Sequence, residues 1–202
     1  VNLFFISFSL ASPSGKNGRL SIFIFHRVLP RPDPLFPDEP DAKRFDELMG
    51  WIKSWFNVLP LDDAIVQLRK QSLPARAAAI TFDDGYADNF TIALPILLKH
   101  KLSATFFIAT GFLDGGRMWN DTIIESVRAC SSATLDLNPV SLAAYSVGSD
   151  HEKREAIAAI ISKVKYRSTI ERVEITERIA NLANALPPSD LMMTTQQLRN
   201  MR

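Results

Sequence analysis

The first 130 residues alternate between short apolar segments and longer segments with helical periodicity. The short segments are rich in residues that favour strands, whereas the longer ones repeat apolar residues about every 3.6 positions. Strands that alternate with helices are typical of a parallel sheet or barrel, since helices carry the chain back between parallel strands. The sequence therefore predicts an α/β fold. The expected strands are 20–25, 57–59, 77–82 and 104–110, and the expected helices are 42–56 with Asp41 as N-cap, 61–70, 87–100 with a bend at Pro95, and 120–129.

Two adjacent aspartates and a glycine follow the apolar segment 77–82. This order places Asp83 and Asp84 at the carboxyl edge of the sheet, where α/β proteins build their active sites. Two neighbouring carboxylates are hard to ionise together without a cation, so one could bind a metal while the other accepts a proton from water. Asp-Asp-Gly is also common turn chemistry. Both interpretations stay open at this point.

Composition limits the other classes of function. The 202 residues are 47% hydrophobic, enough for one real core but too few for two large domains. A formal net charge of +1 gives no basic field for nucleic acid. Cys130 is the only cysteine, so no internal disulfide is expected. The apolar residues 1–10 are too few to span a bilayer, and no basic residue of a signal peptide precedes them, so we expect no transmembrane segment and favour a cytoplasmic location. The small residues 11–15 that follow leave a clipped or atypical signal peptide as the alternative.

The character of the sequence changes after Cys130. Residues 131–150 are polar and are predicted to be irregular. Two amphipathic helices are then expected at 151–165 and 169–185. Residues 191–193 could start another strand, and Thr194 or Thr195 would cap a helix that reaches the end of the sequence.

Three motifs at the predicted strands together resemble the polysaccharide deacetylases with a NodB-type homology domain, carbohydrate esterase family 4. They are Phe25-His26-Arg27-Val28, Ile80-Thr81-Phe82-Asp83-Asp84-Gly85-Tyr86 and Ala104-Thr105-Phe106-Phe107-Ile108-Ala109-Thr110-Gly111. The order and spacing of the motifs also agree with that family. The similarity covers residues 18–130. Residues 118–121 and the helical segment after them resemble the branch found beside bacterial exopolysaccharide gene clusters.

The resemblance implies a distorted (β/α) barrel and a metal-dependent hydrolase that removes N-acetyl groups from amino sugars of a polysaccharide. It implies that Asp83 is the general base and that Asp84 binds a divalent metal, usually zinc. Such a metal lowers the pKa of bound water and polarises the amide oxygen. The expected partner is an acetylated polysaccharide or oligosaccharide. His26, Tyr86 and Trp119 are expected to line the substrate pocket. His26 and Trp119 could equally be packed in the fold, and Tyr86 could belong only to the turn.

The resemblance also implies a domain organisation. Residues 1–17 would be an N-terminal extension, and 18–130 the N-terminal part of the deacetylase barrel. Residues 131–190 would be a helical insertion, and 191–202 the start of the continuing barrel, cut short.

The second motif of the family, His-Ser/Thr-x-x-His, is missing. The histidines are His26, His100 and His151, and none of them is paired at that spacing. The Asp-His-His metal triad is therefore incomplete, although catalytic zinc normally has about three protein ligands. We expect that the sequence stops before this motif. The alternatives are a non-catalytic carbohydrate-binding relative and a different aspartate enzyme, such as a phosphohydrolase, for which the usual Asp-x-Asp spacing is absent.

Overall fold

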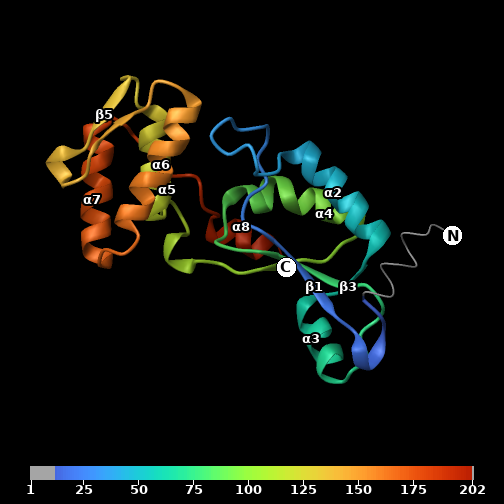
Figure 1. Cartoon of the computed structure of the whole chain (residues 1–202). Helices are drawn as coiled ribbons and strands as arrows, with labels where there is room; N and C mark the ends of the chain where they lie inside the picture. Colours follow the sequence, from blue (N-terminus) through green and yellow to red (C-terminus); the bar gives the residue numbers. More distant parts are fainter. Residues whose placement is uncertain (1–11, 202) are drawn as a thin grey trace. The chain divides into compact units, whose positions relative to one another are not determined.

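The computed structural model describes residues 12–201, which form two compact units (Figure 1). The first unit contains Asp38–Leu113 together with the described parts of residues 1–32 and 193–202. The second contains Asp33–Pro37 and Asp114–Met192. The predicted domain boundaries stay predictions, and the second unit begins upstream of residue 131.

The first unit is built on a sheet of four parallel strands. The central strand β3 (Ala77–Phe82) is buried along its whole length, as expected for a parallel strand covered on both faces. Strand β1 (Leu20–Phe25) pairs with all of β3. On the other side of β3, β2 (Asn57–Val58) pairs with its beginning and β4 (Thr105–Phe106) with its end. The predicted α/β class with a parallel sheet is confirmed.

Helices α2 (Ala42–Trp55), α3 (Leu61–Arg69) and α4 (Leu94–His100) connect these strands. Asp41 caps α2 as predicted, because its side chain accepts a hydrogen bond from the Arg44 backbone N–H. The short helical turn η1 (Gly15–Asn17) precedes β1, and η3 (Thr110–Phe112) follows β4. The apolar core lies between the sheet and the α2 and α4 helices, and its buried members are Val28, Phe45, Met49, Ile52, Ile80, Phe82, Ala93 and Leu97.

The predicted helix 87–100 is helical throughout, but it is not a regular α-helix. Residues Asn89–Ala93 form a π-helical turn (η2), and α4 begins only at Leu94. Pro95 is close to the start of α4, directly after this turn, and Ala93 before it also has helical backbone angles. The π-helical turn is the irregularity of this helix, and it lies just before Pro95.

The predicted strand 104–110 is regular only in β4. The next residues still follow the end of β3, since the Phe107 N–H donates to the Phe82 carbonyl at 2.8 Å and the Ala109 N–H to the Asp84 carbonyl at 3.0 Å. Asp84 has a positive φ of 74°, so the backbone on that side leaves the extended conformation that a regular ladder needs.

The predicted strand 191–193 is also not a regular strand. Within the first unit, the Met193 N–H donates to the Gly85 carbonyl at 3.0 Å. Thr194 is the N-cap of α8 (Thr195–Asn200), and its side chain accepts from the Gln197 N–H. The sequence predicts Thr194 or Thr195 as the N-cap, and the structure shows that it is Thr194.

The second unit consists of α5 (Trp119–Ala129), α6 (Asp150–Val164), α7 (Thr169–Leu182) and a small hairpin. The hairpin pairs β5 (Thr134–Asp136) with β6 (Ala144–Ser146) in antiparallel fashion across the turn η4 (Asn138–Val140), which corrects the prediction that 131–150 is irregular. Strands of three residues are too short to show the alternating pattern that identifies a strand. The buried core of the unit is Leu35, Ile123, Val127, Cys130, Leu135, Leu137, Val140, Val147, Ala156, Ile157, Ile160, Val164, Ile179, Ala183 and Ala185.

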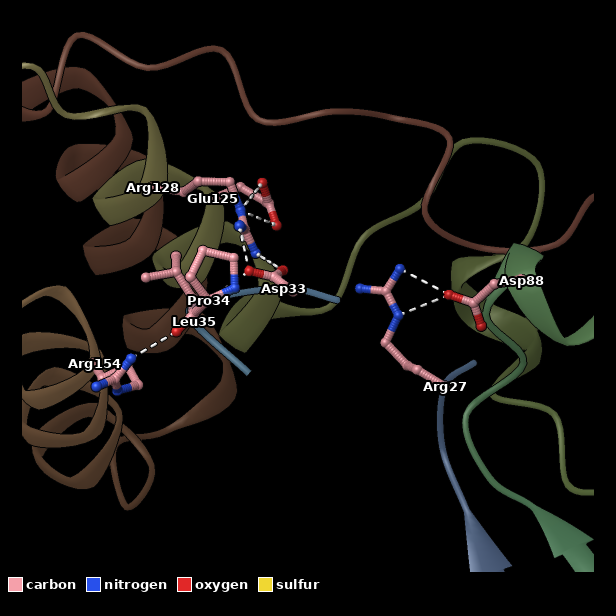
Figure 2. Close-up of polar contacts among 8 residues, drawn as sticks. All are labelled: Arg27, Asp33, Pro34, Leu35, Asp88, Glu125, Arg128 and Arg154. Atoms are coloured by element: carbon pink, nitrogen blue, oxygen red, sulfur yellow. Dashed lines mark hydrogen bonds and ion pairs between the residues drawn. The ribbon is translucent and has the colours of Figure 1, made fainter. Parts of the chain in front are cut away.

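The proline-containing segment Asp33–Pro37 is attached to the second unit by arginine side chains (Figure 2). Arg128 donates to both carboxylate oxygens of Asp33, at 3.0 and 2.7 Å. Arg154 donates to the carbonyl of Pro34 at 2.6 Å. A fork-like arginine contact of this kind fixes the orientation of the carboxylate as well as its position.

No helix within residues 12–201 is both long enough and apolar enough to cross a bilayer.

Candidate functional site

The two aspartates lie on the turn that follows the central strand. The Asp83 N–H donates to the Phe25 carbonyl at 2.9 Å, which extends the pairing of β1 with β3 by one residue. The chain then reverses, with positive φ angles of 74° at Asp84 and 86° at Gly85. The Gly85 N–H donates to the Asp83 carbonyl at 2.9 Å. The sequence thus holds both acids at the carboxyl edge of the sheet, as predicted.

Gly85 is required at this turn for two reasons. Its φ of 86° lies in a region that residues with a side chain rarely adopt. A Cβ atom at this position would also lie 3.1 Å from both Cδ1 and Cγ2 of Ile108. The tightness of the turn therefore depends on glycine, whereas Asp84 tolerates its own positive φ better than most residues do.

The side chains of His26 and Asp83 face each other across the ends of β1 and β3. The distance from His26 Nε2 to Asp83 Oδ2 is 4.0 Å, and the two side chains are 52% and 39% exposed. The gap is longer than a hydrogen bond. Both groups are consequently within reach of water or of a substrate group placed between them.

Tyr86 is also at this turn, but its ring is 5% exposed. The guanidinium of Arg27 lies 4.6 Å from the centre of the ring, within the range of a cation–π contact. Tyr86 therefore forms a buried support beneath Arg27.

A polar network joins the residues after β1 to the residues after the acidic turn, and Figure 2 shows its contact between Arg27 and Asp88. Both Nε and Nη2 of Arg27 lie 2.8 Å from Asp88 Oδ2, and the Val28 N–H donates to Asp88 Oδ1 at 3.2 Å. Asn89 Nδ2 donates to the His26 carbonyl at 2.9 Å and to Asp88 Oδ1 at 3.2 Å. Burial raises the pKa of Asp88, and the Arg27 guanidinium opposes that rise.

Glu39 is a further half-buried acid in this electrostatic environment. Burial raises its pKa, and the charges of His26 and Arg27 act in the opposite direction. Glu39 lies in the proline-rich segment after β1 and has no motif around it. Its relation to the site could not be recognised from the sequence.

Trp119, the last predicted site residue, belongs to the second unit. It begins α5 and packs, partly buried, against the apolar core of that unit. The Arg172 guanidinium lies 5.4 Å from the centre of its ring. The structure thus gives Trp119 a packing role, and it brings together His26, Asp83, Asp84 and Tyr86 in the first unit.

Across residues 12–201, no three His, Cys, Asp or Glu side chains gather in an arrangement that could hold a metal ion. The other two histidines are engaged elsewhere: His100 lies 2.7 Å from Asp46, and His151 lies 3.5 Å from Glu155. Since catalytic zinc normally takes three protein ligands, the described side chains do not by themselves fit a zinc site.

Comparison with known proteins places the acidic turn in a recognised segment. Residues 70–134 match the family model described as polysaccharide deacetylase. A protein of Bacillus subtilis (strain 168) named "Putative polysaccharide deacetylase YxkH" is 30% identical over 95 residues. These residues are 46% of this chain and 33% of that protein, so the chain spans one third of the length of this relative. The resemblance to polysaccharide deacetylases is confirmed.

Two solved structures are also similar to part of the chain. A de-N-acetylase from Aggregatibacter actinomycetemcomitans is 27% identical, with a TM-score of 0.40, over 47% of this chain and 39% of that one. IcaB from Ammonifex degensii is 24% identical, with a TM-score of 0.39, over 55% of this chain and 48% of that one.

Proposed function

We propose that the protein is a hydrolase that removes N-acetyl groups from amino sugars of a polysaccharide. The observation that supports the proposal is the place of Asp83. It lies within the matched segment 70–134, directly after the buried central strand of a parallel sheet, and its side chain is 39% exposed. A carboxylate at this edge is in the usual position of a catalytic group in an α/β protein.

The proposed reaction uses Asp83 as the general base. The oxygen of a water molecule attacks the carbonyl carbon of the acetamide, and the Asp83 carboxylate takes the proton that this water loses. The bond from carbon to nitrogen then breaks as the nitrogen accepts the proton held by Asp83. The acetic acid released gives its proton to the amine, so the products are acetate and a protonated amine and the Asp83 carboxylate is restored. His26, with its Nε2 4.0 Å from the carboxylate, is placed to orient Asp83 or to contact the acetamide.

We also propose that Asp84 is one ligand of a divalent metal, with zinc the expected ion. Carboxylate oxygen is an ordinary zinc ligand, and Asp84 follows the proposed base directly. The remaining ligands would have to come from outside the described residues. The test is the metal content of the full-length protein, measured by mass spectrometry before and after Asp84→Ala. Equal metal content in the two proteins would reject Asp84 as a ligand.

The decisive experiment for the activity is acetate release from N-acetylglucosamine oligomers by the full-length protein. We expect release by the parent, loss of release with Asp83→Asn, and unchanged release with Asp63→Asn, which alters an exposed acid on α3. Full activity of Asp83→Asn would contradict the assignment of the base. A parent that binds the oligomers but releases no acetate would instead be the non-catalytic carbohydrate-binding relative.

A further inference from the structure

We propose that Arg27, Asp88 and Asn89 together position His26 beside Asp83 for the proposed reaction. We refer to these three residues as the clamp. The inference rests on the proposed function for its catalytic consequence. The contacts themselves, however, are properties of the first unit alone.

The clamp holds the backbone on both sides of His26. Its carbonyl accepts a hydrogen bond from Asn89 at 2.9 Å, and the N–H of Val28 donates to Asp88 at 3.2 Å. The residue before His26 is tied to the same segment, since the Phe25 carbonyl accepts from the Asp83 N–H. The end of β1 is therefore attached directly to the segment that carries the proposed base.

The imidazole ring itself is not fixed to Asp83. It is 52% exposed, and Nε2 is 4.0 Å from the nearest carboxylate oxygen, beyond hydrogen-bond distance. The position of the ring thus depends on the backbone that carries it. The clamp controls this backbone, so it also controls the separation of His26 and Asp83.

The clamp is a costly arrangement if its purpose is stability alone. Asp88 is 7% exposed and Asn89 is fully buried. Ionic groups in such places are often replaced by apolar residues without loss of stability. Moreover, Asn89 Oδ1 is buried without a hydrogen-bond partner among the described residues, which is unfavourable. In this orientation the Asn89 amide donates hydrogen bonds to the His26 carbonyl and to Asp88.

A double-mutant cycle tests whether the clamp acts through His26. In the full-length protein we expect Asn89→Ala to lower kcat for acetate release by about tenfold or more, because small misplacements in an active site reduce rates steeply. The same substitution in a His26→Gln background should lower kcat by less than about twofold, since the residue it positions is already gone. The fall in Tm should be equal in the two backgrounds. An equal fall in kcat with and without His26 would overturn the proposal.

A control variant shows whether the loss of any hydrogen bond from an asparagine to a backbone carbonyl lowers kcat, or only the loss of the one that positions His26. Asn57 on β2 also donates through Nδ2 to a backbone carbonyl, that of Ala75, at 2.7 Å. Asn57→Ala should leave kcat unchanged. Arg27→Lys serves as a second clamp variant, because it keeps the charge but loses the two-nitrogen contact with Asp88.

A crystal structure of the Asn89→Ala variant tests the clamp independently of activity. We expect the distance from His26 Nε2 to Asp83 Oδ2 to differ by more than about 1 Å from that in the parent, or the ring to take several positions. An unchanged distance with a single ring position would overturn the proposal. If the parent releases no acetate, the proposed function fails, but this distance still decides whether the clamp positions His26.

Discussion

The acids around Arg128 in the second unit and Asp83 in the first unit have different surroundings. In the second unit, Asp33 and Glu125 are 18% and 14% exposed and both contact Arg128, at 2.7 and 3.1 Å. In the first unit, Asp83 is 39% exposed and lies 4.0 Å from the half-exposed His26. Acids tied to an arginine hold a segment in place, whereas an acid left open at a strand end is available for chemistry. The comparison separates residues that matter for stability from those that matter for activity.

The largest expected loss of stability comes from the aromatic core of the first unit. Phe82 is fully buried, with its ring centre 4.9 to 5.8 Å from those of Phe25, Phe45 and Phe106. We expect Phe82→Ala to lower the free energy of unfolding by about 3–5 kcal/mol, because it leaves a cavity among these rings. Urea-induced unfolding measures the loss. Phe107→Ala, at a residue 51% exposed, is the matched control and should cost little.

The aliphatic core of the second unit should respond almost as strongly. Ile160 on α6 is fully buried. We expect Ile160→Ala to cost about 2–4 kcal/mol, as large-to-small changes of aliphatic core residues do. Ile170→Ala, at a residue 81% exposed, should change the free energy of unfolding by less than about 0.5 kcal/mol. Similar losses for the two isoleucines would show that the core of this unit is loosely packed.

The features that could be predicted from the sequence are those formed by residues close together in the chain. The apolar strand before Asp83 and the glycine after Asp84 are adjacent in the chain, so the acidic edge could be found from them. The contact of Arg27 with Asp88 joins residues 61 positions apart, and no periodic pattern connects them. The hairpin of β5 and β6 has three-residue strands, below the length at which alternation is visible.

Replacing Arg128 should give the next largest loss in the free energy of unfolding. It tests whether the contacts of Arg128 with Asp33 and Glu125 stabilise the second unit. Its side chain is 34% exposed, so solvent screens part of its interaction with Asp33 and Glu125. We expect Arg128→Met to cost about 1–2 kcal/mol, because it removes the arginine that contacts two partly buried carboxylates. Adding Asp33→Asn to this variant should recover part of the loss. If Arg128→Met unfolds at the same urea concentration as the parent, the acids of the second unit do not hold the Asp33–Pro37 segment.

Asp84 provides the opposite case, an acid whose removal should spare stability. Its φ of 74° is easily adopted by glycine and asparagine. We expect Asp84→Gly and Asp84→Asn to unfold within about 1 kcal/mol of the parent, whereas Asp84→Val should cost about 1–3 kcal/mol from backbone strain. All three variants should lose the proposed deacetylase activity. A large loss of stability in Asp84→Asn would mean that this carboxylate is structural.

The smallest expected effect concerns Asp46. This acid belongs to the first unit but, like Asp33 in the second, it contacts a basic side chain closely. Lys99 donates to both of its oxygens, at 2.9 and 2.7 Å, and His100 lies 2.7 Å from Oδ1. The Lys99 and His100 contacts hold the pKa of Asp46 below its usual value. A carboxyl with a lowered pKa in the folded state contributes stability above its unfolded pKa of about 3.9 and loses it as pH falls through the folded value.

The parent should therefore lose stability more steeply than Asp46→Asn as pH falls below about 4, so the difference in Tm between the two should shrink with falling pH. Glu47→Gln, at the exposed neighbouring residue, is the control and should follow the parent over this range. High salt should also reduce the difference, because it screens pairs at the surface. A difference in Tm that is constant from pH 7 to about pH 2 would show that the charge of Asp46 does not contribute to stability. Asp46 would then differ from Asp33, whose contact with a basic side chain is expected to stabilise the fold.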